Sequence, residues 1–311
     1  MQRRDFLRAG LSSAVAATVG SASAPAQPRT APSARAESKV RFKLKYAPHF
    51  GMFEAHAGPD LVDQLKFAAD EGFTAFEDNE MRGRGVGVQE RIARELGRLG
   101  LELGVFVAND NGLEFPILTS GDKFLREAFL HDIRQSVEVA KRVNTKRATL
   151  VVGRTFHRLQ HGYQFANVVE ALKRAAELCE RSGLVLVAEP LNVYRDHPEF
   201  FVFSNHEMYA LIKAVDSPSV KILFDVYHTQ VNEGNIIPNI DLTWDEVAYV
   251  QTGDHPGRNE PGTGEINYRN VFRHLHQKGY TGIVGMEHGQ SRPGKEGERA
   301  VIDAYVAADG F

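Results

Sequence analysis

The chain has 311 residues, of which 42% are hydrophobic and 25% are charged, as expected for a water-soluble globular protein with a sizeable core. Its formal net charge of −3, without a dense basic stripe beyond the N-terminal region, argues against a nucleic-acid partner. The single cysteine, Cys179, excludes an internal disulfide, and beyond the N-terminal region no apolar run reaches the roughly 18 residues of a membrane-spanning helix.

The N-terminus has the pattern of an export signal. Arg3-Arg4-Asp5-Phe6-Leu7 is close to the twin-arginine motif, a mildly apolar stretch covers residues 9–19, and small residues suited to cleavage follow. We therefore predict a twin-arginine signal peptide over residues 1–26 and a periplasmic location; a disordered or lipid-associated tail is the alternative. Because this pathway moves folded proteins, it suits a protein that acquires a cofactor before export.

After the signal, the composition changes twice. Residues 27–38 are rich in Ala, Pro, Ser and Arg and are predicted to be a linker, and one folded domain is predicted over residues 39–311. In this domain short apolar runs alternate with amphipathic segments, and several runs are continuous, which is typical of parallel strands covered on both faces. The predicted strands are Val40–Tyr46, Phe73–Glu77, Leu103–Ala108, Arg147–Gly153, Leu184–Glu189, Val220–Asp225, Val247–Thr252 and Gly282–Glu287.

The segments between these strands have apolar residues at helical spacing, and several end at a glycine, a common helix stop. The sixth helix has the weakest pattern, because only Ile236–Thr243 is available and it contains Pro238. The other stripes are Leu61, Leu65 and Ala68-Ala69; Ile92, Leu96 and Leu99; Ile133, Val137, Ala140 and Val143; Val168, Leu172, Ala175, Ala176 and Cys179; and Phe272, Leu275 and His276.

Eight strands alternating with helices predict an α/β fold of the (β/α)8 TIM-barrel type. A doubly wound sheet is the alternative, and it would carry a glycine-rich phosphate loop after the first strand. The segment Ala47–Gly51 has no such fingerprint, and the glycines of Gly83–Gly87 lack the Lys-Ser/Thr of a P-loop. The barrel is therefore preferred.

Polar side chains follow the apolar runs of the last four predicted strands. Glu189, Asp225, Gln251 and Glu287 are 36, 26 and 36 residues apart, each about one β/α unit. In a barrel they would converge at the C-terminal mouth, where chemistry is concentrated. Three carboxylates there would repel one another without a cation, and an oxygen-only donor set suits Mg²⁺ or Mn²⁺, with Co²⁺ or Zn²⁺ as less favoured alternatives.

Five segments of the chain resemble the hydroxypyruvate isomerase family, among the xylose isomerase-like TIM barrels. They are Ala188-Glu189-Pro-Leu-Asn192, Asp225-Val-Tyr-His228, Gln251-Thr-Gly-Asp-His-Pro256, Arg258-Asn-Glu-Pro-Gly-Thr-Gly-Glu-Ile-Asn-Tyr268 and Gly285-Met-Glu287. The likeness runs from about Arg41 to the C-terminus, and the glycine-rich run from Glu260 to Tyr268 is its most specific part.

The resemblance implies metal ligands at Glu189, Asp225, Gln251 and Glu287, with the two glutamates also moving protons. It places His228 and Arg258 at substrate oxygens. The residue types suit this reaction independently. Isomerising an α-hydroxy carbonyl needs a carboxylate to transfer the proton and a Lewis acid for the enediolate oxygens. Arg195 stands where related enzymes often carry an acidic residue, which is a departure from the family pattern.

Other residues keep two interpretations. His49 follows the first strand and is predicted to contact substrate, with a structural role as the alternative. Glu260 is predicted to face substrate or to brace the ligands from the rigid Asn259–Tyr268 loop. Glu77 ends the second strand and either supports the ligands or makes an ordinary hydrogen bond.

The predicted function is therefore a divalent-metal-dependent isomerase acting on a small hydroxy-keto acid or sugar. A ketose 3-epimerase or cyclitol dehydratase using the same site is the enzymatic alternative. A non-catalytic periplasmic barrel that binds sugars or acids is the other. We expect no stable membrane insertion after signal removal, and a homo-oligomer is left open.

Overall fold

A computed structural model describes residues 40–311 of the protein. The predicted signal peptide (residues 1–26) and linker (27–38) therefore lie outside the described residues. All eight predicted strands are present, in the expected order. Their bounds are β1 Lys45–Ala47, β2 Ala75–Phe76, β3 Glu102–Leu103, β4 Arg147–Leu150, β5 Val185–Ala188, β6 Val220–Asp225, β7 Val247–Gln251 and β8 Ile283–Gly285.

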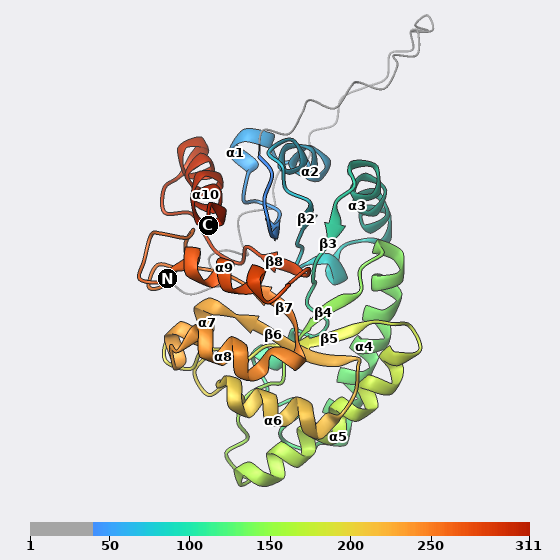
Figure 1. The fold of residues 1–311 in the computed structure, drawn as a ribbon. Helices are drawn as coiled ribbons and strands as arrows, with labels where there is room; N and C mark the ends of the chain where they lie inside the picture. Colours follow the sequence, from blue (N-terminus) through green and yellow to red (C-terminus); the bar gives the residue numbers. More distant parts are fainter. Residues whose placement is uncertain (1–39) are drawn as a thin grey trace, which may run out of the picture. The chain divides into compact units, whose positions relative to one another are not determined.

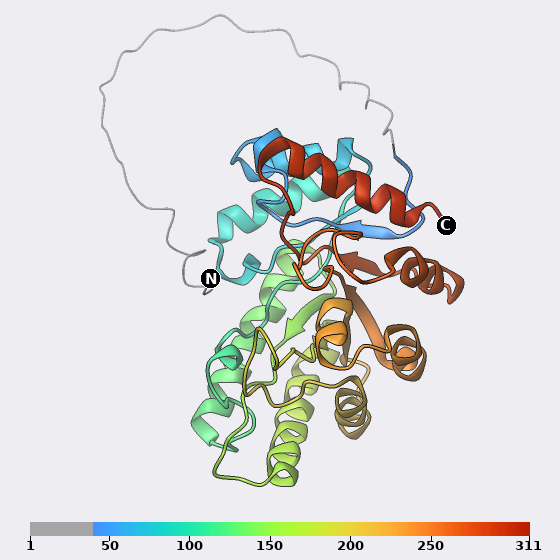
Figure 2. The same cartoon turned by 90° about the vertical axis from the view of Figure 1, so that its left-hand side faces the viewer.

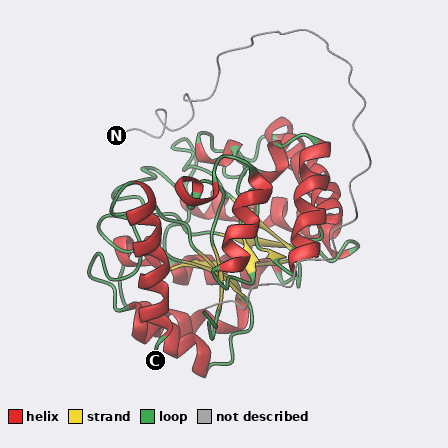
Figure 3. Ribbon diagram, turned by 90° about the horizontal axis from the view of Figure 1, so that it is seen from above, coloured by secondary structure: helices red, strands yellow, loops and turns green. Residues whose placement is uncertain are grey.

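The strands pair only in parallel, as the continuous apolar runs predict. Six of them form one sheet in the order β1-β8-β7-β6-β5-β4, and β2 pairs with β3. Two isolated parallel bridges, His49 to Glu77 and Val107 to Thr149, join this pair to the ends of the larger sheet. The strands lie at the centre with the helices around them (Figure 3), which confirms the predicted α/β TIM barrel.

The main outer helices alternate with the strands (Figure 1). The helices are α1 Glu54–Ala57, α2 Leu61–Asp70, α3 Val86–Leu99, α4 Lys123–Val143, α5 His161–Glu180, α6 Asn205–Val215, α7 Val226–Asn232, α8 Ile236–Thr243, α9 Tyr268–Gln277 and α10 Gly294–Asp309. Figure 2 shows α10 beside the first elements of the domain. Asp309 at its end accepts the backbone N–H of Lys43 at 2.7 Å, so the two ends of the described domain are tied together.

The predicted sixth helix is confirmed as α8, with the expected bounds. Pro238 is its third residue, where the backbone N–H would have no partner inside the helix, so proline is tolerated there. The predicted strand lengths are too long in seven of eight cases. The third overlaps its prediction least: β3 begins at Glu102 and ends at Leu103, although Val105 and Phe106 beyond it are fully buried. An apolar run in the sequence indicates which residues are buried. The part of that run that pairs with a neighbouring strand is shorter than the buried segment.

A small apolar cluster is built from most of the strands and is separate from the larger core. It comprises Ala47, Ala75, Val105, Val187, Leu223, Tyr249 and Ile283, all at most 2% exposed. These are the side chains that fill the barrel interior. Successive strand residues face opposite sides, so positions two residues further along face the same interior. Those positions are Glu77, Glu189, Asp225, Gln251 and, after Gly285, Glu287.

Cys179 lies on the buried face of α5 and is fully buried. Burial raises the pKa of its thiol to about 12, so the thiolate is scarce at neutral pH, as is typical of a cysteine in an apolar core. Over residues 40–311, none of the helices combines the length and apolar character needed to cross a membrane.

Candidate active site

The four predicted metal ligands end neighbouring strands of the large sheet. Glu189 directly follows β5, Asp225 and Gln251 are the last residues of β6 and β7, and Glu287 lies two residues after β8. Glu189, Asp225 and Gln251 are at most 6% exposed, whereas 23% of the Glu287 side chain is accessible. The site is therefore a largely buried set of oxygen atoms, and Glu287 is its most exposed member.

The carboxylates converge as the sequence predicts. Glu189, Asp225, His228 and Glu287 each place one potential ligand atom within 4.8 Å of all the others. Burial raises the pKa of Asp225 to about 6; the positive charge of Arg258 opposes this shift and the negative charge of Glu287 adds to it. Acidic groups this close and this buried are stabilised by a cation.

The donor atoms fit a divalent ion. Among the described residues, Asp225 Oδ2 and Gln251 Oε1 are buried without a hydrogen-bond partner. Buried oxygens of this kind are normally paired, and an oxygen-binding cation would satisfy both. Carboxylate and amide oxygens are the ligands of Mg²⁺ and Mn²⁺. These two atoms, with Glu189 and Glu287, form the candidate metal site.

His228 is near the same carboxylates, but its hydrogen bonds indicate a different task. Its Nδ1 lies 3.1 Å from the backbone nitrogen and 2.7 Å from the amide nitrogen of Asn192. The Asn192 amide is fixed in orientation, because its oxygen accepts the backbone N–H of Arg195 and of Asp196. Nδ1 must therefore accept, and the neutral ring carries its proton on Nε2.

With a proton on Nε2, His228 is a donor and not a metal ligand. Nε2 lies 3.4 Å from Glu189 Oε1, on the side of the carboxylate cluster, and 3.3 Å from a guanidinium nitrogen of Arg258. The contact of His228 with a substrate oxygen stays a prediction. The proton on Nε2 favours Gln251 over His228 as the fourth ligand, because the Gln251 amide oxygen is an acceptor without a competing proton.

Arg258 is the cation beside the cluster. Its guanidinium contacts Glu287 Oε2 in a short ion pair, is centred 4.8 Å from the Tyr227 ring, and lies 3.9 Å from Asp196. Burial opposes its charge, but Glu287, Asp225 and Glu189 together raise the pKa of the guanidinium above its ordinary value. Arg258 thus stays charged at the place where the sequence predicts a contact with substrate.

Two residues that follow β2, Glu77 and Asn79, form hydrogen bonds with the predicted ligands. Glu77 accepts the amide N–H of Gln251 in a short hydrogen bond and the hydroxyl of Tyr249 at 2.9 Å. Asn79 donates from its amide to Glu287 Oε1 at 2.9 Å. Burial foremost, with the charge of Glu287, raises the pKa of Glu77 to about 8. Of the two interpretations of Glu77, the structure therefore supports contact with a predicted ligand.

The loop over residues 259–268 is held by one buried carboxylate that the sequence analysis did not identify. Asp254 is fully buried, and its two oxygens accept the backbone N–H groups of Gly262, Gly264 and Ile266 at 2.8–3.1 Å. The loop backbone therefore turns inward around Asp254. The base of the loop is also fixed through the backbone, because Arg258 donates its backbone N–H to the backbone carbonyl oxygen of Asp254 at 2.7 Å.

The side chains of Glu260 and His49 are both engaged by protein atoms. Both oxygens of Glu260 are engaged by Ser291, through its backbone N–H at 2.9 Å and its hydroxyl. His49 has its Nδ1 2.8 Å from the Phe50 carbonyl oxygen and its Nε2 3.2 Å from that of His288. Their predicted contacts with substrate stay predictions.

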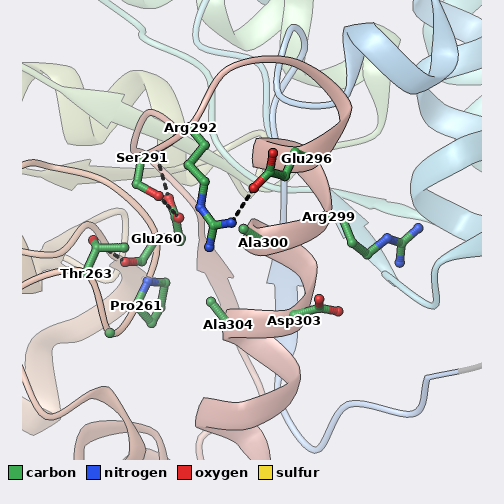
Figure 4. A pocket seen from close by; sticks show the side chains of 11 residues that line it. Glu260, Pro261, Thr263, Ser291, Arg292, Glu296, Arg299, Ala300, Asp303 and Ala304 are labelled. Carbon is green, nitrogen blue, oxygen red and sulfur yellow. Dashed lines mark hydrogen bonds and ion pairs between the residues drawn. The ribbon is translucent and has the colours of Figure 1, made fainter.

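Glu260 also lines a hollow of about 440 Å³ between its loop and α10 (Figure 4). Both arginines that line this hollow are paired with carboxylates: Arg292 with Glu296 at 2.6 Å, and Arg299 with Glu71 at 2.8 Å. This hollow is distinct from the carboxylate cluster, because none of the predicted metal ligands lines it.

Comparisons with known proteins agree with this architecture. Residues 65–305 match the family described as xylose isomerase-like TIM barrel. The chain is 32% identical over 162 residues to hydroxypyruvate isomerase of Escherichia coli, covering 52% of this chain and 62% of that protein. It is 26% identical over 230 residues to 2-oxo-tetronate isomerase of Pectobacterium atrosepticum, covering 73% and 86%.

The fold also matches solved structures. A 3-keto-D-glucoside 4-epimerase from Escherichia coli superimposes with a TM-score of 0.71 at 20% identity, over 86% of this chain and all of that one. A D-psicose 3-epimerase superimposes with a TM-score of 0.68 at 17% identity, covering 86% and 98%. These likenesses concern the fold. With the family match and the sequence relatives, they show that the chain belongs to the xylose isomerase-like TIM barrels, within the hydroxypyruvate isomerase family.

Proposed function

We propose that the protein is a divalent-metal-dependent isomerase of a small hydroxy-keto acid or sugar. The observation that carries the proposal is the convergence of Glu189, Asp225 and Glu287 at the C-terminal mouth of a barrel, beside the strand that ends at Gln251, whose amide oxygen is buried without a hydrogen-bond partner. A divalent ion held there would act as a Lewis acid for the two oxygens of an α-hydroxy carbonyl.

The two glutamates are the proposed acid and base. One carboxylate oxygen of each lies within 4.8 Å of the other, so both glutamates reach a substrate bound at the same ion. One would remove the proton beside the carbonyl, and the other would return a proton to the neighbouring carbon. His228 Nε2–H would hold a substrate oxygen, and Arg258 would hold a carboxylate if the substrate has one.

A small acid is the favoured substrate. The relatives are named for hydroxypyruvate and 2-oxo-tetronate, which are both short hydroxy-keto acids. The guanidinium of Arg258 at the mouth is consistent with an anionic substrate. The epimerase and dehydratase alternatives use the same acid–base pair, so a panel of hydroxypyruvate, 2-oxo-tetronate and free ketoses separates them.

The test combines turnover with proton exchange. Glu189→Gln and Glu287→Gln each keep the size of the side chain but remove the base, so each variant should lose at least about 1,000-fold in turnover. The measurement is isomerisation, with deuterium incorporation from solvent, in Mn²⁺-containing buffer. Glu90→Gln, on the exposed face of α3, is the matched control and should keep wild-type activity.

Near-normal rates in both active-site variants would refute the assignment. Lack of deuterium incorporation into every ligand that binds would indicate a binding protein.

A further inference from the structure

Glu77 is a buried carboxylate that the proposed reaction does not use. It follows β2 on the interior face of the barrel, two residues after Ala75, and is 2% exposed. Burying a carboxylate in this position is unfavourable unless its oxygens are hydrogen-bonded. Both oxygens are: one accepts from the Gln251 amide and the other from the Tyr249 hydroxyl.

The space for this carboxylate comes from two glycines. A Cβ on Gly285 in β8 would lie 2.0 Å from Glu77 Oε2 and 2.9 Å from Gln251 Cγ. A Cβ on Gly104, just after β3, would lie 2.2 Å from the Tyr249 hydroxyl oxygen. Any larger residue at Gly285 would displace Glu77 or Gln251. The barrel wall is therefore shaped around this pair of hydrogen bonds.

The hydrogen bond decides which end of the Gln251 amide faces the other ligands. Glu77 Oε1 accepts from the Gln251 NH₂ group and Glu77 Oε2 accepts from the Tyr249 hydroxyl, so the NH₂ end of the amide faces Glu77. The opposite end, Oε1, is then directed away from Glu77, and it is buried without a hydrogen-bond partner among residues 40–311. An amide ligates a hard cation through oxygen and never through its NH₂ group.

We propose that Glu77 is a positioning residue that fixes the Gln251 amide with its oxygen toward the bound ion. The inference rests on the proposed metal-dependent function. Glu77 does not touch the ion or the substrate in this arrangement. It acts through Gln251, as supporting carboxylates act on ligands elsewhere, and loss of such support typically weakens metal binding by about 10- to 100-fold.

The first experiment measures Mn²⁺ affinity of the full chain by calorimetry, together with the thermal midpoint of the metal-free protein. Glu77→Gln keeps the shape but offers either end of its own amide to Gln251. We expect Mn²⁺ to bind about 10- to 100-fold more weakly to this variant. Glu90→Gln is the control and should bind as wild type does.

The second experiment exchanges the two residues. In the double variant Glu77→Gln/Gln251→Glu, residue 77 can donate its NH₂ to a carboxylate at 251, and the other oxygen of that carboxylate faces the ion. Mn²⁺ affinity should return to within about threefold of wild type or exceed it, which two independent structural losses would not produce. This arm also decides the matter if Glu77→Gln alone does not fold.

Unchanged Mn²⁺ affinity in Glu77→Gln would overturn the inference while leaving the proposed function intact. An exchanged variant that binds no better than Glu77→Gln, or that does not fold, would also overturn it. If the wild-type protein itself binds no Mn²⁺, the proposed function fails with it, so the two failures are distinguishable.

Discussion

At the scale of single residues, the site depends on hydrogen bonds that hold each functional atom in one chemical form. Asn192 is fully buried and donates its amide to His228 Nδ1 at 2.7 Å, which leaves the His228 proton on Nε2. This is the same principle that we infer for Glu77 and Gln251: a supporting side chain selects which atom of its neighbour faces the reaction.

Replacing Asn192 by Asp should therefore change the tautomer of His228. A carboxylate at position 192 accepts instead of donating, so it competes with the backbone N–H of residue 192, which lies 3.1 Å from Nδ1, and favours a proton on Nδ1 over one on Nε2. We expect kcat/KM to fall by about tenfold or more, because a hydrogen bond to the substrate is lost. Mn²⁺ affinity should stay within about threefold of wild type. Nitrogen chemical shifts of the His228 ring report the tautomer directly, and an unchanged tautomer with unchanged kcat/KM would contradict the assignment.

The residues that could be predicted from the sequence are those that end apolar runs. Glu189, Asp225, Gln251 and Glu287 each end an apolar run of the sequence, and this local signal predicts that they lie together at one end of a barrel. The role of Glu77 stayed open, although it stands two residues after Ala75 on the same interior face. Asn192 and Asp254 were not identified, because their partners are set by loop conformation and not by a sequence period.

At the scale of elements, the loop over residues 259–268 contains two positions where the backbone favours glycine, each for a different reason. Gly264 packs so closely that a Cβ on it would lie 1.9 Å from the His255 carbonyl oxygen and 2.7 Å from Asp254 Oδ1. Gly262 has a positive φ of 87°, but a Cβ there would meet nothing within 4 Å. The two glycines therefore serve different purposes within one loop.

Gly264→Ala should disrupt this loop more than Gly262→Ala. The first forces backbone apart and weakens the hydrogen bonds to Asp254, so we expect a loss of about 2–4 kcal/mol in the free energy of unfolding. The second meets only the unfavourable backbone angle and should lose about 1 kcal/mol. Chemical denaturation measures both, and kcat/KM should fall further for Gly264→Ala because Arg258 stands at the loop base. Equal losses in the two variants would contradict the packing argument.

The order of elements was predictable because burial of a parallel barrel leaves a regular alternation of apolar runs and helical stripes. The residues at which the strands begin and end were less predictable from the sequence. The segment from Gly104 to Ala108 has the apolar character of a strand, but only β3, Glu102–Leu103, pairs with β2. The remainder bridges to β4 at a single position, Val107 to Thr149. Closure of the barrel is a tertiary event, and composition alone does not specify how many rungs of each ladder form.

At the scale of the whole molecule, the proposed metal site is built from the ends of four different strands of the barrel. The proposed ligands lie at the ends of β5, β6, β7 and β8, and Glu77, which follows β2, accepts a hydrogen bond from one of them, Gln251. A cation bound at this junction would link elements far apart in the sequence. Binding would therefore stabilise the folded chain as a whole, because the unfolded chain cannot gather these atoms.

Metal removal should consequently lower the stability of the entire domain. Protein treated with a chelator and then given Mn²⁺ at about 100 times its Kd should gain about 2.7 kcal/mol in the free energy of unfolding. For a domain of this size that gain corresponds to a rise in Tm of about 5–10 °C, measurable by calorimetry. Asp225→Asn is the matched control, since it keeps the shape of the side chain but removes a charged ligand, and its Tm should respond to Mn²⁺ by less than about 2 °C. A wild-type Tm that does not move with Mn²⁺, at concentrations up to several millimolar, would contradict a divalent ion bound by these four strands.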